Sequence, residues 1–170
     1  MSLQHSQFTV SIAPEPLPSA RTPVSIFLAG SIEMGKAVDW QAEVTKGLTH
    51  LPVTIFNPRR SDWDGNWKQD IAEPQFKEQV DWEMDRLESS DVIALYLQPT
   101  TMSPISLLEL GMHAAGGKVV VCCPEGFWRR GNVQIVCHRY GLELVKDIPT
   151  LVKRLEARLH QAMENKANIP

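Results

Sequence analysis

The chain has 170 residues, of which 43% are hydrophobic and 22% are charged, and its formal net charge is −3. These values are ordinary for a globular domain, and the negative charge argues against binding to a nucleic acid polymer. No apolar run approaches the roughly 20 residues that span a bilayer, so no membrane partner is expected. The start of the chain, MSLQHSQFTV, lacks the features of a signal peptide, and a cytoplasmic location is therefore expected.

The first third of the chain contains an arm and two strands. Residues 1–22, which include APEPLPSARTP, are predicted to form a flexible arm. A strand is expected at 23–30, because PVSIFLAG is a short apolar run that ends in Gly. Helical spacing of apolar residues predicts a helix at 37–51, and VTIF predicts a second strand at 53–56. The turn-rich segment NPRRSDWDGNW, residues 57–67, follows as a loop.

The rest of the chain alternates between helices and strands. Helices are predicted at 75–90, from about 105, at 131–139 and at 147–165; strands are predicted at 91–97, 118–123 and 142–145. Such alternation predicts a parallel sheet with helices on both faces. We therefore expect one α/β domain at 23–165, followed by a tail at 166–170. Its fold is a flavodoxin- or Rossmann-like three-layer sandwich with a five-stranded sheet in the order 2-1-3-4-5.

This strand order also predicts where a ligand binds. In such sheets, ligands bind at the carboxyl ends of the strands where the winding reverses, here between the first and third strands. The loop after the first strand is GSIEMG (30–35), and the loop after the third is QPTTMSPIS (98–106). Topology therefore brings Gly30, Ser31 and Glu109 toward one crevice.

Two carboxylates occupy unexpected positions. Glu83 falls on the apolar stripe of the 75–90 helix, which is formed by Phe76, Val80, Met84 and Leu87. An inward carboxylate is costly unless it is paired, so Glu83 either has a special role or lies at the stripe's edge and reaches water or an Arg.

Glu109 has two interpretations. Ser106-x-x-Glu109 is a capping box, while Ser103 followed by Pro104 offers a competing helix start with Ser103 as N-cap. Alternatively, Glu109 does chemistry. The helix dipole would keep a carboxylate in the first turns ionised, as a nucleophile requires.

Four segments resemble the nucleoside 2-deoxyribosyltransferase-like family and the related deoxynucleoside 5′-phosphate N-hydrolases: IFLAGSI, NPRRSDW, QVDWEMDRLESSDVIALYL and SPISLLELGMHAA. The resemblance covers about residues 24–140. It implies that Glu109, in E-L-G, attacks C1′ of a nucleoside or nucleotide and displaces the base. A free nucleobase or water then releases the sugar with retention. Relatives carry an acid that binds or protonates the base at the position of Glu83, and the reaction needs no metal or redox cofactor.

Other positions refine what the resemblance implies. Ser103 occupies a place where nucleoside transferases typically carry an Asp that touches a sugar hydroxyl, and where the 5′-phosphate hydrolases carry a Ser that touches the phosphate. Relatives often carry a Tyr that holds the nucleophile where this chain has Phe27, so other groups must orient Glu109. Asn132 matches an Asn that relatives supply from the adjacent subunit, which implies a homo-oligomer, a dimer or higher. The alternative for Asn132 is a helix N-cap.

The loop at 57–67 and the helix after Glu109 supply further candidates. Asn57, Asp62 and Trp63 should border the crevice, where polar and aromatic groups read and stack on a nucleobase; a surface turn with one buried Trp is the alternative. His113 lies one turn after Glu109 on the same helix face and is a candidate substrate contact, although helical His residues are more often merely exposed.

A metal site is not expected, because the histidines form no ligand pattern with Cys122, Cys123 and Cys137, which we predict to be buried free thiols. Two other functions stay open at this point. One is a nucleotide-sensing module without catalysis, which Phe27 supports. The other is cleavage of a different glycosidic substrate, such as a ribonucleotide or NAD.

Overall fold

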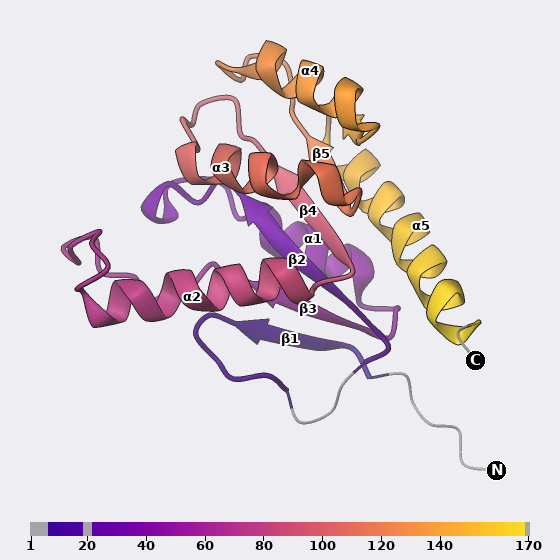
Figure 1. Ribbon diagram of the computed structural model, residues 1–170, viewed down its shortest axis with the longest axis horizontal. Coiled ribbons are helices and arrows are strands. Elements are labelled where there is room, and N and C mark those ends of the chain that lie inside the picture. The colour runs from indigo at the N-terminus through magenta and orange to yellow at the C-terminus, as the bar shows by residue number, and fades with distance from the viewer. Residues whose placement is uncertain (1–6, 19–21, 169–170) are drawn as a thin grey trace.

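The computed structural model describes residues 7–18 and 22–168, in which strands and helices alternate (Figure 1). The strands are β1 (Thr9–Ile12), β2 (Val24–Gly30), β3 (Val53–Asn57), β4 (Val92–Tyr96), β5 (Val119–Cys122) and β6 (Glu143–Val145). The α-helices are α1 (Trp40–Leu48), α2 (Pro74–Ser89), α3 (Pro104–His113), α4 (Arg130–Tyr140) and α5 (Ile148–Ala167), and the 3₁₀ helices are η1 (Glu33–Gly35) and η2 (Ala114–Gly116). None of the described helices is both long and apolar enough to cross a membrane.

The sheet is parallel and its strand order is β1-β3-β2-β4-β5-β6. The last five strands of this order are the predicted 2-1-3-4-5, so the α/β Rossmann-like fold is confirmed. The predicted number of five strands is wrong, because residues 9–12 of the predicted arm form an edge strand on β3. Alternation of Phe8, Val10 and Ile12 is the period-two signal of this strand. Residues 1–6, 19–21 and 169–170 lie outside the described residues.

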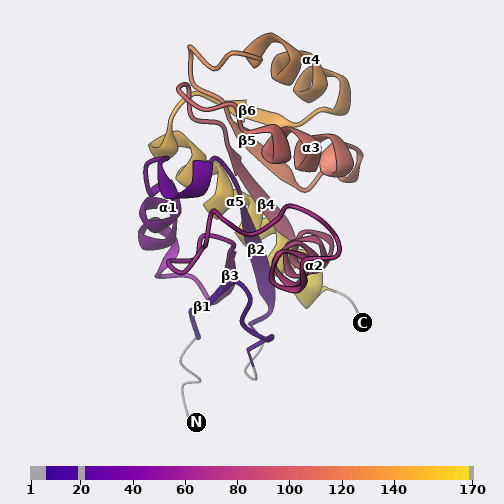
Figure 2. The same cartoon turned by 90° about the vertical axis from the view of Figure 1, so that its left-hand side faces the viewer.

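Each face of the sheet is covered by helices. Trp40 of α1 and Leu155 of α5 pack on one face, while Trp82 of α2, Leu110 of α3 and Val133 of α4 pack on the other. Figure 2 shows α1 and α2 on opposite sides of the sheet. Burial on both faces explains why β2 is a continuous apolar run rather than an alternating one.

Helix α2 is rotated relative to its predicted stripe. Of the four predicted stripe residues, Leu87 alone is buried, and Gln79 and Trp82 face the sheet instead. The Trp82 ring lies 6.2 Å from the rings of Phe27 and Phe56, and such aromatic pairs contribute about 0.5–1.5 kcal/mol each. The large indole therefore determines which face of α2 turns inward, and it brings Gln79 to the interior.

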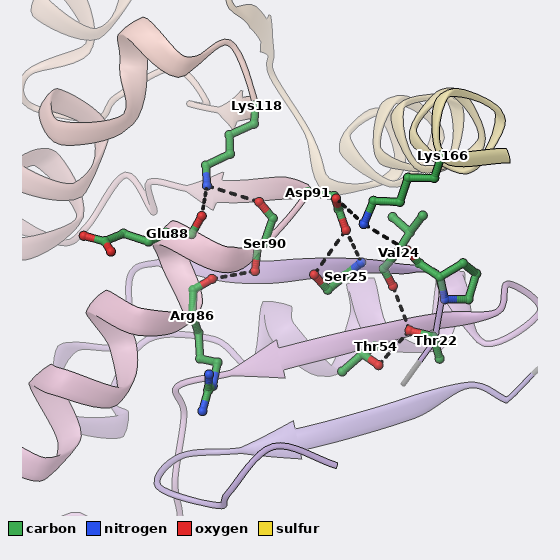
Figure 3. Close-up of polar contacts among 11 residues, drawn as sticks. Thr22, Val24, Ser25, Thr54, Arg86, Glu88, Ser90, Asp91, Lys118 and Lys166 are labelled. Carbon is green, nitrogen blue, oxygen red and sulfur yellow. Dashed lines mark hydrogen bonds and ion pairs between the residues drawn. The ribbon is translucent and has the colours of Figure 1, made fainter. Parts of the chain in front are cut away.

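A polar network closes the edge of the sheet where the strands begin (Figure 3). Asp91, just before β4, accepts a hydrogen bond from the Ser25 N–H at 2.8 Å and pairs with Lys166 of α5 at 2.7 Å. Lys118, just before β5, donates three hydrogen bonds to main-chain carbonyls at the C-terminal end of α2. These contacts anchor α2 and α5 at the amino edge, so the N-terminal parts of α2 and α3 lie over the carboxyl edge.

Candidate active site

Gly30 makes a close approach between β2 and β4 at the carboxyl edge of the sheet. Its φ is +140°, a conformation that L side chains rarely adopt. A Cβ atom at this position would lie 2.3 Å from the carbonyl oxygen of Tyr96. Glycine is therefore required here, and it delivers Ser31 to the loop that follows β4.

Three buried hydroxyl groups meet beside Gly30 and form a hydroxyl cluster (Ser31, Thr101 and Ser103). Ser31 Oγ lies 2.6 Å from Ser103 Oγ and 2.9 Å from Thr101 Oγ, and the latter two are 2.7 Å apart. Ser31 Oγ also accepts a hydrogen bond from the Gln98 N–H at 2.9 Å. The structure thus brings Ser31 and Ser103 together.

The carboxylate of Glu33 accepts hydrogen bonds from the main-chain N–H groups just before α3. Its Oε1 accepts hydrogen bonds from the N–H groups of Met102 at 3.1 Å and Ser103 at 3.0 Å. The φ angles of Glu33 and Met34 are +48° and +55°, and such left-handed non-glycine residues cost on the order of 1–3 kcal/mol each. A helix N-terminus attracts anions, and here the chain itself supplies one.

Glu109 is not a helix cap. Helix α3 begins at Pro104, with Ser103 at the N-cap position, so Glu109 lies in the second turn. The predicted Ser106–Glu109 capping box is wrong, because the helix starts earlier, at the Pro. The Ser103 hydroxyl makes no capping hydrogen bond either, since it belongs to the hydroxyl cluster.

The carboxyl group of Glu109 has no hydrogen-bond donor among the residues that the structure describes. Its side chain is buried, with 7% of the residue exposed. Burial, followed by the charge of Glu83, raises the pKa of the Glu109 carboxyl to about 8, and no hydrogen bond within the described residues offsets this. The prediction that the helix dipole keeps Glu109 ionised is wrong, because the dipole acts mainly within the first turn and burial outweighs it.

Glu83 approaches Glu109 from α2, which lies beside α3 on the same face of the sheet (Figure 1). Burial raises the pKa of the Glu83 carboxyl, and a hydrogen bond from Gln79 Nε2 to Glu83 Oε1, at 2.8 Å, opposes that rise. Gln79 also donates to the Pro58 carbonyl at 3.2 Å and accepts from Arg60 Nη1 at 3.3 Å. Neighbouring carboxyl groups in such different surroundings can divide acid and base roles.

Comparison with known proteins shows the family of the chain. The profile of a family described as nucleoside 2-deoxyribosyltransferase like matches residues 23–127, more than half of the chain. The chain belongs to this family. A conserved protein from Enterococcus faecalis V583 is 16% identical, with a TM-score of 0.57 over 80% of this chain and 99% of that chain. This likeness shows the fold alone, and no curated protein matches the sequence.

In this nucleoside 2-deoxyribosyltransferase-like chain, the loop after β3 is tied together by its own polar groups. Asn57 Oδ1 accepts a hydrogen bond from the main-chain N–H two residues later at 3.0 Å, and the exposed Asp62 pairs with Arg60 at 2.6 Å. The Trp63 ring lies 5.1 Å from that of Trp67. The indole N–H of Trp63 is buried and has no partner within the described residues.

Two predicted residues lie apart from the carboxyl pair. His113 ends α3, and burial and then the charge of Lys118, at the start of β5, lower its pKa. Because Lys118 lies at the amino edge, the structure does not bring His113 to Ser31. Asn132 is exposed within α4, whose N-cap is Arg129. The alternative interpretation of Asn132 as an N-cap is therefore wrong.

Phe27 cannot supply a hydrogen bond to Glu109. Its ring is fully buried in the core beneath α2 and α3. A Phe ring has no hydroxyl to donate. The pKa of the Glu109 carboxyl is therefore set by burial and by the charge of Glu83.

Two residues of the site, Glu33 and Gln79, were not predicted from the sequence. Gln79 gave a signal, because it lies one helical turn before Glu83, on the same side of α2. Glu33 gave none, since the amides that it binds lie 69 and 70 residues further along the chain.

Within residues 7–18 and 22–168, no group of three or more His, Cys, Asp or Glu side chains could hold a metal ion. Cys122, Cys123 and Cys137 are buried free thiols. Burial raises their pKa values to about 12, about 11 and about 11, respectively. Such thiols are poor nucleophiles at neutral pH.

Proposed function

We propose that the protein transfers 2′-deoxyribosyl groups between nucleobases through a covalent bond to Glu109. The observation that carries this proposal is the pair formed by the nearby Glu83 and by Glu109, which is buried and has no hydrogen-bond donor in the part of the chain that the structure describes. Because two coupled carboxyl groups can share one proton, one can be ionised while the other is protonated. Burial favours a protonated Glu109 at rest, so the reactive form is the one in which the shared proton has passed to Glu83. The ionised Glu109 is then the nucleophile, and Glu83 is the acid for the leaving base.

The reaction has two balanced steps. In the first, the C1′–N bond breaks, a C1′–O bond to Glu109 forms, and the proton of Glu83 moves to the departing base. In the second, a nitrogen of another base attacks C1′, the bond to Glu109 breaks, and the proton of the incoming base passes to Glu83. Two inversions at C1′ give net retention. Water in place of the second base would make the enzyme a hydrolase.

The aromatic loop after β3 supports a base as the acceptor. Arg60 contacts Gln79, the hydrogen-bond donor to Glu83, and its guanidinium lies 5.3 Å from the Trp67 ring centroid. The loop is thereby coupled to the acid. Because indole rings stack on nucleobases, Trp63 and Trp67 would favour a base over water at this position.

Glu33 supports an unphosphorylated donor. Family resemblance places a 5′-phosphate near Ser103 in the phosphate-specific relatives. In this chain the Ser103 N–H is bound by the Glu33 carboxylate, and its hydroxyl is bound within the hydroxyl cluster. A phosphate at this position would meet a negative charge and would have to displace it. We therefore propose 2′-deoxynucleosides, rather than their 5′-monophosphates, as donors.

A base-exchange assay tests both parts of this proposal. Wild type, Glu33→Gln and a control, Glu43→Gln on the exposed side of α1, are incubated with 2′-deoxynucleosides or their 5′-monophosphates, with and without a second base. We expect exchange of nucleosides by wild type, and about tenfold better use of monophosphates by Glu33→Gln alone, since a like charge is removed. Inactivity of wild type with every donor contradicts the function. Preference of wild type for 5′-monophosphates contradicts the proposal that 2′-deoxynucleosides are the donors.

We further propose that the protein associates as a homo-oligomer through the outer side of α3. Ile105, Leu108 and Met112 are 59%, 57% and 43% exposed and follow one stripe of the helix. This stripe borders Glu109 on the helix surface, so a second copy would cover the site. Sedimentation velocity tests this proposal, and a monomer at micromolar concentration would contradict it.

A further inference from the structure

The side-chain amide of Gln79 has a fixed orientation. Gln79 is 2% exposed. Its two neighbours other than Glu83 are of opposite types, since the Arg60 guanidinium donates hydrogen bonds and the Pro58 carbonyl accepts them. Oε1 must therefore face Arg60, and Nε2 must face Pro58. A flipped amide would place two donors together and two acceptors together.

This orientation determines how Glu83 is bound. The second hydrogen of Gln79 Nε2 points to Glu83 Oε1 at 2.8 Å, so this oxygen is an acceptor and a proton on Glu83 must be on Oε2. We propose that Gln79, held by Arg60 and Pro58, is the positioning residue of the acid and that it confines the transferable proton to Oε2 of Glu83. The catalytic part of this inference rests on the proposed transfer reaction; the hydrogen-bond arrangement does not.

The chain of contacts extends outward from Glu83. Arg60 binds both carboxylate oxygens of Asp62, at 2.6 and 2.7 Å, and its side chain is 11% exposed. A bidentate pair of this kind holds the guanidinium plane in place. Asp62, Arg60 and Gln79 thus form a hydrogen-bonded series that starts at the protein surface and ends at the acid.

This series also adjusts the strength of the acid. The charged groups that face Glu83 from other elements are Glu109 on α3 and, through Gln79, the Arg60–Asp62 pair. Burial favours the protonated form of Glu83, whereas the hydrogen bond from Gln79 favours the ionised form. Without Gln79, Glu83 would hold its proton more tightly and would be a weaker acid toward the leaving base.

The test compares Gln79→Met with Gln75→Met, which places the same substitution at an exposed position one turn earlier on α2. Titration of ¹³C-labelled glutamate carboxyl groups by NMR, with Glu83→Gln identifying the signal of Glu83, measures the acid directly. We expect the titration midpoint of Glu83 to move to higher pH in Gln79→Met and to stay in place in Gln75→Met. We also expect kcat of base exchange to fall about tenfold with KM little changed, a part of the 10²–10⁴-fold contribution of a positioned acid.

A second pair of variants covers the possibility that Gln79→Met fails to fold. Arg60→Lys keeps a donor toward Gln79 Oε1, whereas Arg60→Met removes that donor, so that Pro58 and Glu83 alone hold the amide and its hydrogen bond to Glu83 is weakened. The titration midpoint of the Glu83 carboxyl should move to higher pH in Arg60→Met. In Arg60→Lys it should stay at the wild-type value. An unmoved midpoint in the folded variants overturns the inference, as does an unchanged kcat in an active enzyme. A moved midpoint in a protein that exchanges no base overturns the proposed function instead and leaves the hydrogen-bond arrangement standing.

Discussion

Glu109→Gln is expected to abolish base exchange and, at the same time, to stabilise the folded protein at alkaline pH. Loss of the nucleophile should lower the exchange rate by a factor of about 10³–10⁶. The gain in stability follows from linkage. The pKa of the Glu109 carboxyl is raised from 4.5 to about 8 on folding, so the folded state binds more protons than the unfolded state between these values. The free energy of unfolding of wild type therefore falls as pH rises through this window.

The glutamine variant does not titrate, so its advantage over wild type should grow from about pH 5 to pH 8 and then level off. The upper bound of this advantage is on the order of 3–5 kcal/mol. Urea unfolding of wild type, Glu109→Gln and the exposed control Glu164→Gln at pH 5, 7 and 9 measures it. A uniform loss of about 1 kcal/mol, as for a removed helix cap, would contradict a buried Glu109 carboxyl with no hydrogen-bond partner among the described residues.

Gly30→Ala is expected to destabilise the protein by more than about 3 kcal/mol or to prevent folding. The added Cβ would lie 2.3 Å from the Tyr96 carbonyl oxygen and 3.0 Å from the Trp40 ring. The main-chain oxygen cannot move without opening the pairing of β2 with β4, and β4 carries the loop to Ser103.

Gly35→Ala is the matched control. Gly35 also has a positive φ, +86°, but a Cβ there would meet nothing within 4 Å. Gly35→Ala should therefore lower the free energy of unfolding only through backbone strain, by about 1–2 kcal/mol. Urea midpoints of the two variants separate the close contact from the strain. Equal losses at both positions would show that the approach of Gly30 to β4 is not tight.

Much of this fold could be predicted because its information is local. Apolar runs bounded by Gly and Pro located β2, β3, β4 and β5, and their alternation with helices determined the order of the sheet. Strand β1 was missed because its short alternating pattern stands next to a Pro-rich segment, and its stability comes from pairing with β3. The inward face of α2 was misassigned because spacing does not weigh side-chain size, whereas packing favours the large ring of Trp82.

For the candidate site, the identity of the two carboxylates could be predicted, whereas their properties could not. Glu109 and Glu83 could be found from topology, from helical spacing and from family resemblance. Their properties could not, because the raised pKa of Glu109 depends on burial and on a neighbour from another helix. Gln79 acquires its position from Arg60 and Pro58, and Glu33 binds amides on a distant loop. Such contacts exist only once the chain has folded.

The proposed covalent bond between Glu109 and the sugar can be detected directly. The measurement is mass spectrometry of the intact protein and of its peptides after acid quenching with an excess of 2′-deoxynucleoside. We predict a mass increase of one deoxyribosyl group, located at Glu109, absent from Glu109→Gln and lost when a second base is added. Base exchange by Glu109→Gln, or an adduct located at another residue, would contradict the account.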